Sequence, residues 1–502
     1  MKVAVIGTGA AGYAAISTLS EVISNLDLFV FDPDGTTPTA AELQLGQKDH
    51  RLWSAEDFEL VHEAIKAEVG SSFPPPKSNF GKQIPKRDAK IPRELPMAKE
   101  PGGLTNYWSS SLFPFSDADF LGSSVTLADL KPFYRKIADR VGIAGRRDMW
   151  DDFFGDTYIT RPPVEATELA EGLIDALKDG KGSPNGIVAG LNRLGIETRQ
   201  EESTCCVQCG GCFYGCYRGS ILNAATALKR EGLDSGYQRI PETVSKIESS
   251  RSSLTVVTES DRHSGFDKVF CAAGCIASNE IALRSLGGAG DRLVFHDNDI
   301  FSFPIFYFGN ALNTDLDRYT AIANVALGFP PDRHNDPFAM AQIAPVPDYL
   351  LRFYIPSQFA RYAIFAARKL RARILLAKLF VDGRTSPRVA IELDNKAGAK
   401  FELVESGRSK EAVRRVMSRL RQHLKGSPFF VPPFPPIALS TSYHYAGGLT
   451  GMDTPLALPS NGQAARGTYF VDSSVLANSP AQPLTFTIMA NAARIVTEAA
   501  DG

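Results

Sequence analysis

The amino-terminal segment constrains the fold more strongly than any other part of the chain. Residues 2–7, KVAVIG, form an apolar run rich in β-branched side chains, which predicts a strand buried on both faces. Gly7, Gly9 and Gly12 follow at G-x-G-x-x-G spacing; AAISTLSEVI then predicts a helix, and LDLFVFD predicts a second buried strand. Asp32 ends that strand, 20 residues after Gly12, where its carboxylate would accept a hydrogen bond from a ribose hydroxyl. The order predicts a dinucleotide-binding βαβ unit in an α/β fold with a parallel sheet.

Each glycine of the motif has its own physical role. Gly7 permits the tight turn, Gly9 lets the backbone approach a pyrophosphate, and Gly12 lets the helix pack closely on the strand. The first helical residues, Ala10 and Ala11, offer free N–H groups and the positive end of the helix dipole to the phosphates. The alternative is a glycine-rich turn that binds no nucleotide, and the motif itself does not distinguish FAD from NAD.

Length and charge limit the remaining possibilities. A chain of 502 residues is too long for one simple core and predicts two or three lobes. With 54 basic and 56 acidic residues it lacks the basic excess of a nucleic-acid-binding protein, so we expect no nucleic-acid partner. We expect no membrane-spanning helix, because no uncharged apolar run reaches about 18 residues. A strand that begins at residue 2 leaves no room for a leader, which predicts a cytoplasmic protein with few disulfides.

The carboxyl-terminal region carries a family resemblance. SYHYAGG at 442–448, FVDSS at 470–474 and AQP at 481–483 resemble the closing segment of the glucose–methanol–choline (GMC) flavin oxidoreductases. Other segments agree in the same order along the chain, and together they cover about half of it. They are the amino-terminal motif, PGGLTNYWSSSLFPFSDADF, LADLKPFYRKIADRVGI and FDKVFCAAGCIASNEIALRSLG.

The resemblance implies FAD as the cofactor and a discontinuous Rossmann-like domain. Beyond the amino-terminal motif, the residues it assigns to FAD binding are Gly103, Asn106, Tyr107, Trp108, Asp472, Ser473 and Pro483. We expect the FAD domain to comprise residues 1–40, 95–125, 200–290 and 440–502. The substrate lobe and surface excursions would then comprise 41–94, 126–199 and 291–439. The lobe would be an inserted sheet, to which FSFPIFYF and RVAIELD contribute strands.

Two residues match the catalytic positions of the family. His444 corresponds to its catalytic histidine, and Gln482 falls where a second active-site residue, Asn or His, is usual. When a flavin takes a hydride from a carbinol carbon, the hydroxyl proton must also leave, and an imidazole suits that task. Gln482 could orient the substrate hydroxyl but could not act as a base. The alternative for His444 is a structural histidine in a turn.

Five cysteines lie within CCVQCGGCFYGCYRG at 205–219. Cys206, Cys209, Cys212 and Cys216 have the C-x2-C-x2-C-x3-C spacing of ferredoxin-type ligands, which predicts a three- or four-iron cluster. The fourth ligand would be Cys216, Cys205 or none, because no proline follows Cys216 and no second cysteine set exists. Zinc, disulfides and a metal-free packing motif are the alternatives. The two remaining cysteines, at 271 and 275, are expected in the core.

These features together predict an FAD-dependent alcohol dehydrogenase. Its substrate would be a sugar-like, sterol-like or lipid-linked alcohol, and its electrons would leave through the cluster to an acceptor protein or quinone. One alternative is an oxygen-using alcohol oxidase with structural or zinc-binding cysteines, and another is a flavoprotein that only binds or scaffolds. Residues 40–100 are expected to cross the surface in an extended form. Residues 359–381 predict a basic, apolar helix that either contacts a membrane surface or packs on the substrate lobe.

Overall fold

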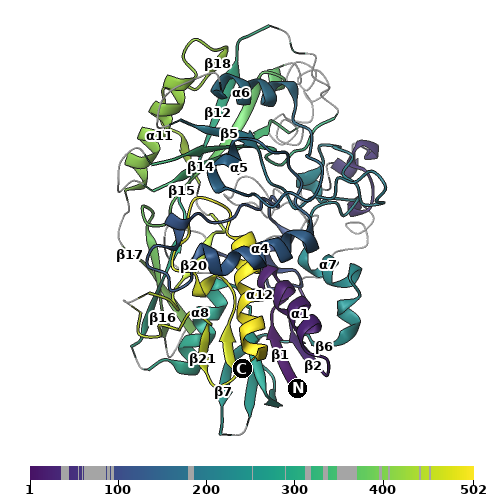
Figure 1. Cartoon of the computed structure of the whole chain (residues 1–502), viewed down its shortest axis with the longest axis vertical. Helices are drawn as coiled ribbons and strands as arrows, with labels where there is room; N and C mark the ends of the chain where they lie inside the picture. Colours follow the sequence, from purple (N-terminus) through teal and green to yellow (C-terminus); the bar gives the residue numbers. More distant parts are fainter. Residues whose placement is uncertain are drawn as a thin grey trace.

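The structure is a computed structural model of the whole chain. It describes all residues except 36–44, 55, 59, 61–85, 88–90, 92–94, 179–185, 252, 289, 311, 313–317, 332–336, 348–369, 395–397, 405–407, 440–441, 452–453 and 502. Figure 1 shows a parallel sheet near both termini at the bottom of the view and a large antiparallel sheet at the top.

The first sheet has six strands in the order β21-β22-β10-β1-β2-β6. All neighbours pair in parallel except β21 and β22. The strands come from distant parts of the chain: β1 (Lys2–Ile6), β2 (Asp27–Phe31), β6 (Tyr237–Ile240), β10 (Lys268–Cys271), β21 (Gln463–Ala465) and β22 (Thr468–Phe470). This discontinuous parallel sheet confirms the predicted Rossmann-like class.

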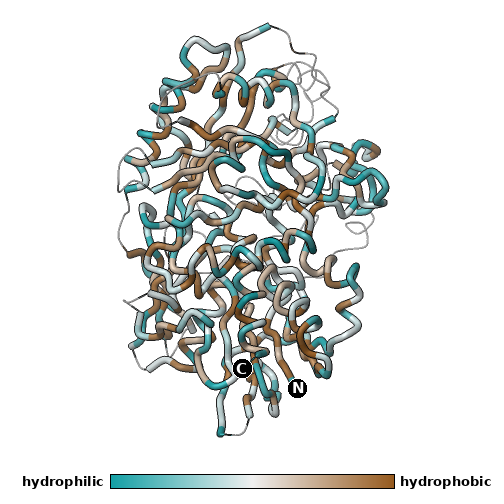
Figure 2. Tube along the Cα trace, viewed as in Figure 1, coloured by the Kyte–Doolittle hydropathy of each residue, from teal (hydrophilic) through white to brown (hydrophobic). Residues whose placement is uncertain are grey.

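Both faces of the parallel sheet are covered, which explains its apolar strands. On one face, Val3 and Val5 pack with α1 (Ala10–Val22), α4 (Leu127–Val141) and α12 (Thr485–Asp501). On the other face, Ala4 and Ile6 pack with α8 (Cys275–Leu286) and the sheet β7 (Val244–Ser249), β8 (Leu254–Thr258) and β9 (Arg262–Phe266). The tube of β1 is accordingly coloured as hydrophobic in Figure 2.

The largest sheet is antiparallel, with the order β18-β12-β15-β14-β13-β5 and β19 paired to β12. Its strands are β5 (Val188–Leu191), β12 (Ile300–Tyr307), β13 (Val325–Phe329), β14 (Ala339–Pro345), β15 (Ile374–Val381), β18 (Phe429–Phe430) and β19 (Ile437–Ala438). One face packs on α6 (Glu168–Lys178) and α11 (Ser409–His423). The predicted strand FSFPIFYF is confirmed as β12.

A four-stranded antiparallel sheet completes the frame. It joins β17 (Gly398–Val404), β16 (Arg388–Asp394), β11 (Arg292–Asp297) and β20 (Tyr445–Gly447). The predicted strand RVAIELD is confirmed as β16, and β20 begins directly after His444. Smaller elements are α5 (Met149–Phe154), α7 (Ala224–Arg230), β3 (Lys86–Arg87) and β4 (Leu95–Pro96).

The helix predicted over 359–381 is wrong for its carboxyl-terminal part. Residues 374–381 form β15, which pairs with β12 and β14. A short run of buried apolar residues suits a strand as well as a helix, and pairing on both sides decides in favour of the strand. Residues 359–369 lie outside the described part of the chain, and so does most of the excursion predicted over 40–100. No helix in the described part is long and apolar enough to cross a membrane.

Candidate active site

A cavity of about 1220 Å³ lies between the parallel sheet and the seven-stranded sheet. Single small ligands usually occupy about 300–1,000 Å³, so this cavity has room for a large cofactor together with a substrate. The amino-terminal motif lines one part of it, and His444 lines another.

The backbone of the amino-terminal motif has the form that phosphate binding requires. Gly7 has a φ of +93°, and a Cβ on Gly12 would lie 1.9 Å from the Gly7 carbonyl oxygen, so no other residue fits there. Helix α1 begins at Ala10, its N-cap Gly9 has no side-chain cap, and its first turn contains no acidic residue. The uncapped N–H groups and the helix dipole therefore leave a positive end at the cavity.

Asp32 follows β2 and lies on the cavity wall. It is buried, and the Thr8 hydroxyl donates a hydrogen bond to it. Burial raises the pKa of Asp32 to about 6, against the lowering effects of the Thr8 hydrogen bond and the Arg239 charge. A buried carboxyl group facing a cavity is suited to accept a hydrogen bond from a ligand hydroxyl, and the predicted contact of Asp32 with a ribose stays a prediction.

The loop at 102–108 closes over the motif. Gly103 has a φ of +53°, and a Cβ there would lie 3.2 Å from the Gly9 Cα, so the two glycine backbones approach closely. Tyr107 and Trp108 line the cavity, and their predicted contact with FAD stays a prediction. Asn106 is not among the lining residues: its amide donates to the Pro101 carbonyl at 2.9 Å. Asn106 therefore shapes the loop, and its predicted contact with the cofactor stays a prediction.

Asp472 joins the carboxyl-terminal region to the start of α8 at the cavity. Its carboxylate accepts the Gly274 N–H at 2.8 Å and the Ser278 hydroxyl at 2.5 Å. Burial raises the pKa of Asp472. Asp472, Ser473 and Pro483 all line the cavity, and the FAD contacts that the sequence resemblance assigns to them stay a prediction.

His444 is partly buried in the cavity wall immediately before β20, with its Nδ1 atom buried. Its ring stacks on Phe380 of β15, with the centroids 5.1 Å apart and the planes 18° apart. The backbone N–H of His444 donates to the Ser442 hydroxyl at 2.9 Å, and its backbone carbonyl accepts a hydrogen bond from the Ser479 hydroxyl at 2.7 Å. Within the described part of the chain, Nδ1 has no hydrogen-bond partner. Burial lowers the pKa of His444 to about 4, so the imidazole is neutral at pH 7 and able to accept a proton.

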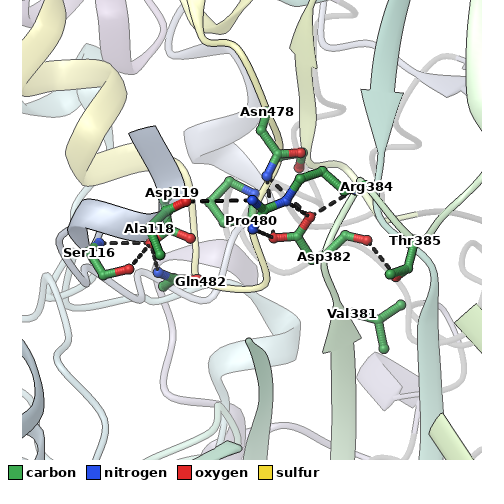
Figure 3. A network of polar contacts seen from close by, with 12 residues as sticks. Ser116, Ala118, Asp119, Val381, Asp382, Arg384, Thr385, Asn478, Pro480 and Gln482 are labelled. Atoms are coloured by element: carbon green, nitrogen blue, oxygen red, sulfur yellow. Dashed lines mark hydrogen bonds and ion pairs between the residues drawn. The ribbon is translucent and has the colours of Figure 1, made fainter. Parts of the chain in front are cut away.

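Gln482 does not line the cavity. Its amide nitrogen donates to Asp119 at 2.5 Å, and Asp119 also accepts the Ser116 N–H at 2.7 Å. Burial raises the pKa of Asp119 to about 6. Figure 3 shows Gln482 directed at Asp119. The predicted contact of Gln482 with the substrate stays a prediction, and the described structure does not bring this side chain to the cavity wall.

The same network contains an ion pair between the buried Asp382 and the more exposed Arg384. The Arg384 guanidinium donates two hydrogen bonds to Asp382, at 2.9 and 2.8 Å, its backbone N–H donates another at 2.8 Å, and the Asn478 amide donates at 3.1 Å (Figure 3). Arg384 also donates to the Ala118 carbonyl at 3.5 Å. These contacts tie the loop around Asp119 to the turn after β15 and to the segment between Asp472 and α12.

The cysteine segment lies beside the cavity loop. Ser220 donates its N–H to the Cys216 sulfur at 3.3 Å, and the Trp108 indole donates to the Leu222 carbonyl at 2.7 Å. Two residues of chain, at most about 7 Å, separate Ser220 from Leu222. The thiols and a cavity-lining tryptophan are therefore close neighbours.

Four thiols share a hydrogen-bonding pattern. Ser220 donates its N–H to the Cys216 sulfur, and the backbone N–H groups of Gln208, Gly211 and Ala321 act on Cys206, Cys209 and Cys212 by lowering their thiol pKa, against the larger effect of burial. Charge on Cys206, Cys209 or Cys216 would raise the pKa of Cys212, so these sulfurs lie within electrostatic range of it. Burial raises the pKa of Cys206 to about 12. Cys205 differs, because its thiol donates to the Cys206 carbonyl at 3.7 Å.

All seven cysteines are free thiols, so the disulfide alternative is not supported. Within the described residues, no group of three or more His, Cys, Asp or Glu side chains is arranged to hold a single metal ion. Cys271 and Cys275 are buried in the core, as predicted.

One wall of the cavity was not predicted from the sequence. The seven-stranded sheet contributes Ser302, Gln342 and Lys378 to it, from three different strands. The only sequence signal was the single lysine within the apolar run ILLAKLFV at 374–381. Strand register was needed to bring the three residues together.

No protein-family model and no curated protein sequence matches this chain. Among solved structures, the crystal structure of pyridoxine 4-oxidase from Mesorbium loti is similar to this chain over its whole length. The TM-score is 0.61, and the alignment covers 99% of this chain and 98% of that chain. The two sequences are 15% identical, so the match establishes a shared fold.

Proposed function

We propose that the chain is an FAD-dependent oxidoreductase of the GMC type that oxidises a CH–OH group. The observation that carries this proposal is one cavity lined both by the dinucleotide motif and by the partly buried, neutral His444. The fold shared with pyridoxine 4-oxidase supports it, because that protein is by its name an enzyme that oxidises an alcohol. The predicted division into an FAD domain and an inserted substrate lobe is part of the proposal.

The residues of the cavity fit FAD. The uncapped start of α1 and the approach of Gly9 to Gly103 leave backbone N–H groups for a pyrophosphate. Asp32 would accept from the ribose, and Asp472 with Ser473 would lie along the flavin. FAD, when bound, supplies the acceptor for a hydride from the carbinol carbon.

His444 would accept the proton of the substrate hydroxyl. Its neutral imidazole has a buried nitrogen without a described partner, and the stacked Phe380 ring restricts its orientation. Ser442 and Ser479 hold its backbone from both sides. These contacts preorganise a base on a rigid wall, which lowers the reorganisation needed during the reaction.

We further propose that Cys206, Cys209, Cys212 and Cys216 hold a three- or four-iron cluster. The N–H donor on Cys216 and the backbone N–H groups that lower the thiol pKa of Cys206, Cys209 and Cys212 support it, because N–H groups directed at sulfur stabilise cluster thiolates. Cys205 lacks a described donor of this kind. The cluster, when present, would pass electrons singly to an external protein or quinone. A cluster spreads its ligands more widely than one ion does, which is compatible with the lack of a compact single-ion site among the described residues.

The second candidate is an oxygen-using alcohol oxidase with structural or zinc-binding cysteines. The word oxidase in the name of pyridoxine 4-oxidase favours it. The lack of a described group that could hold a metal ion also favours purely structural cysteines.

The test uses protein purified without oxygen. We expect one FAD per chain, iron with matching sulfide, and reduction of the flavin by an alcohol. Flavin with iron supports the dehydrogenase, whereas flavin without iron and with stoichiometric peroxide in air supports the oxidase. A chain that binds no flavin after reconstitution with FAD would overturn the proposal.

A further inference from the structure

The position of His444 depends on side chains, because this residue lies just outside the sheets. Strand β20 begins at Tyr445, which pairs with Asp297 at the end of β11, so His444 is one residue beyond the ladder. Its backbone N–H donates to the Ser442 hydroxyl at 2.9 Å, and its backbone carbonyl accepts a hydrogen bond from the Ser479 hydroxyl at 2.7 Å. Two serine side chains thus take the place of a neighbouring strand for this residue.

Each serine is in turn held by a buried residue of one short connection. The Ser442 hydroxyl donates to the Asp297 carboxylate. The Ser479 hydroxyl lies within hydrogen-bond distance of both the His444 carbonyl and the Asn298 amide oxygen. Asp297, Asn298 and Ser479 are each 0% exposed. Because an unpaired buried polar group is costly, the network resists rearrangement.

The same connection holds the other partner of the stacked pair. The Asn298 amide nitrogen donates to the Val381 carbonyl at 2.7 Å, and the Val381 N–H donates to the Asp299 carbonyl at 3.2 Å. Val381 directly follows Phe380, the ring on which the His444 imidazole stacks. Both rings are therefore anchored to the same few residues.

The connection lies where two sheets meet. Strand β11 of the four-stranded sheet ends at Asp297, and β12 of the seven-stranded sheet begins at Ile300. The Asn298 amide also donates to the carbonyls of Ser479 and Pro480, at 3.1 and 3.0 Å. The end of β15, the segment before β20 and the segment before α12 thus converge on one short connection.

We propose that Asp297 and Asn298 are positioning residues for the reaction, which hold His444 through Ser442 and Ser479 and hold the ring that stacks on it through β15. Neither residue lines the cavity, so they act through His444 and not on the substrate. A displacement of about 1 Å at a reacting group can cost on the order of 100-fold in rate, so a fixed backbone matters for a base. The proposal rests on the proposed function for the role of His444.

The first test observes the His444 ring by NMR in the flavin-loaded protein. Isotope-labelled histidine gives ring signals for the 7 histidines, and the signal that is missing in His444→Gln belongs to this residue. The stacked Phe380 ring shifts that signal from its ordinary position. We expect Asp297→Ala and Asn298→Ala to move the signal back or broaden it. Asp297→Asn can still accept from Ser442 and should restore most of the wild-type position.

Further variants separate positioning from folding. Ser442→Ala and Ser479→Ala each remove one link and leave the connection intact, so they should move the same signal even if Asp297→Ala and Asn298→Ala fail to fold. Asn491→Ala is the matched control. Asn491 of α12 is 1% exposed, is hydrogen-bonded and does not line the cavity. Its loss should lower stability and leave the His444 signal unchanged.

Anaerobic reduction of the flavin by benzyl alcohol gives the kinetic measurement. In the variants that move the signal we expect kcat to fall about 10- to 100-fold with an unchanged KM, because the displaced group acts in the transition state. An unchanged ring signal in every alanine variant of the network, an unchanged kcat, or an equal effect of Asn491→Ala would overturn the proposal. A ring signal that moves as expected, in a protein whose flavin no alcohol reduces, would support the positioning role and count against the proposed function.

Discussion

The imidazole of His444 lies nearly parallel to the ring of Phe380, at a centroid distance of 5.1 Å. Phe380 belongs to β15 of the seven-stranded sheet, and His444 directly precedes β20 of the four-stranded sheet. The contact therefore fixes the position of His444 relative to both sheets. It also removes water from one face of the imidazole, which is part of the burial that keeps the base neutral.

The neutral state of His444 predicts an unusual pH dependence. Only neutral imidazole accepts a proton, so anaerobic flavin reduction should lose rate near pH 4 and not near the ordinary pKa of about 6.5. Phe380→Ala would expose the ring to water, raise the pKa towards its ordinary value and move the acid limb upward. Stopped-flow reduction between about pH 3.5 and 8 measures this shift. Phe430→Ala, at a partly exposed position of β18, is the control and should keep the wild-type profile. An acid limb at the same pH in Phe380→Ala and in wild type would show that Phe380 does not keep His444 neutral.

Gly12 is expected to tolerate no side chain. A Cβ there would lie 1.9 Å from the Gly7 carbonyl oxygen, within the turn that begins α1. Gly12→Ala must therefore displace the turn, and we expect a loss of about 3 kcal/mol or more in unfolding free energy together with loss of bound flavin. Gly236→Ala is the matched control, because a Cβ there has no atom within 4 Å. Urea denaturation and flavin absorbance measure both effects, and equal stability of the two variants would contradict the steric argument.

The contact between Gln482 and Asp119 predicts a charge effect on stability. Gln482→Glu would place a second carboxyl group against a buried one, so the pair would keep a proton and titrate with a raised pKa. A raised pKa in the folded state means that the folded protein binds more protons than the unfolded chain. The variant should therefore be close to wild type at pH 5 and lose roughly 2–4 kcal/mol by pH 8.

Unfolding in urea at the two pH values measures this difference. Gln238→Glu, at an exposed position of β6, adds the same charge without burial and should change stability by less than about 0.5 kcal/mol. If Gln482→Glu is as stable as wild type at pH 8 but fails to reduce flavin, Gln482 acts on the substrate, as the sequence resemblance implied.

The amino-terminal unit was predictable because its determinants are local. Gly7, Gly9, Gly12 and the flanking apolar runs specify strand, turn and helix within 32 residues. His444 and Asp472 were found through the resemblance alone, since a single histidine in a turn carries no chemical signal of its own.

Other features depend on contacts that the sequence does not encode locally. Gln482 and Asp119 are 363 residues apart in the chain, so their pairing required the folded structure. The strand β15 was mistaken for a helix because a short apolar run suits both. The cavity wall formed by Ser302, Gln342 and Lys378 was missed for the same reason. With a helical assignment for residues 374–381, the strand neighbours of Lys378 could not be identified.

The cysteine segment gives the final prediction. Cys212 is partly buried, its thiol pKa is lowered by the Ala321 backbone N–H, and it lies within electrostatic range of three other thiols, whereas Cys205 donates its own thiol to a carbonyl. If the thiols hold a cluster, Cys212→Ser should lower the iron and sulfide content per flavin several-fold, because it removes a ligand. Cys205→Ser is the matched control and should keep both contents, since its sulfur makes a different contact. Metal analysis and visible absorbance after anaerobic purification measure the outcome. Equal iron in both variants would reject the proposed ligand set, and one zinc per wild-type chain would replace the cluster with a structural ion.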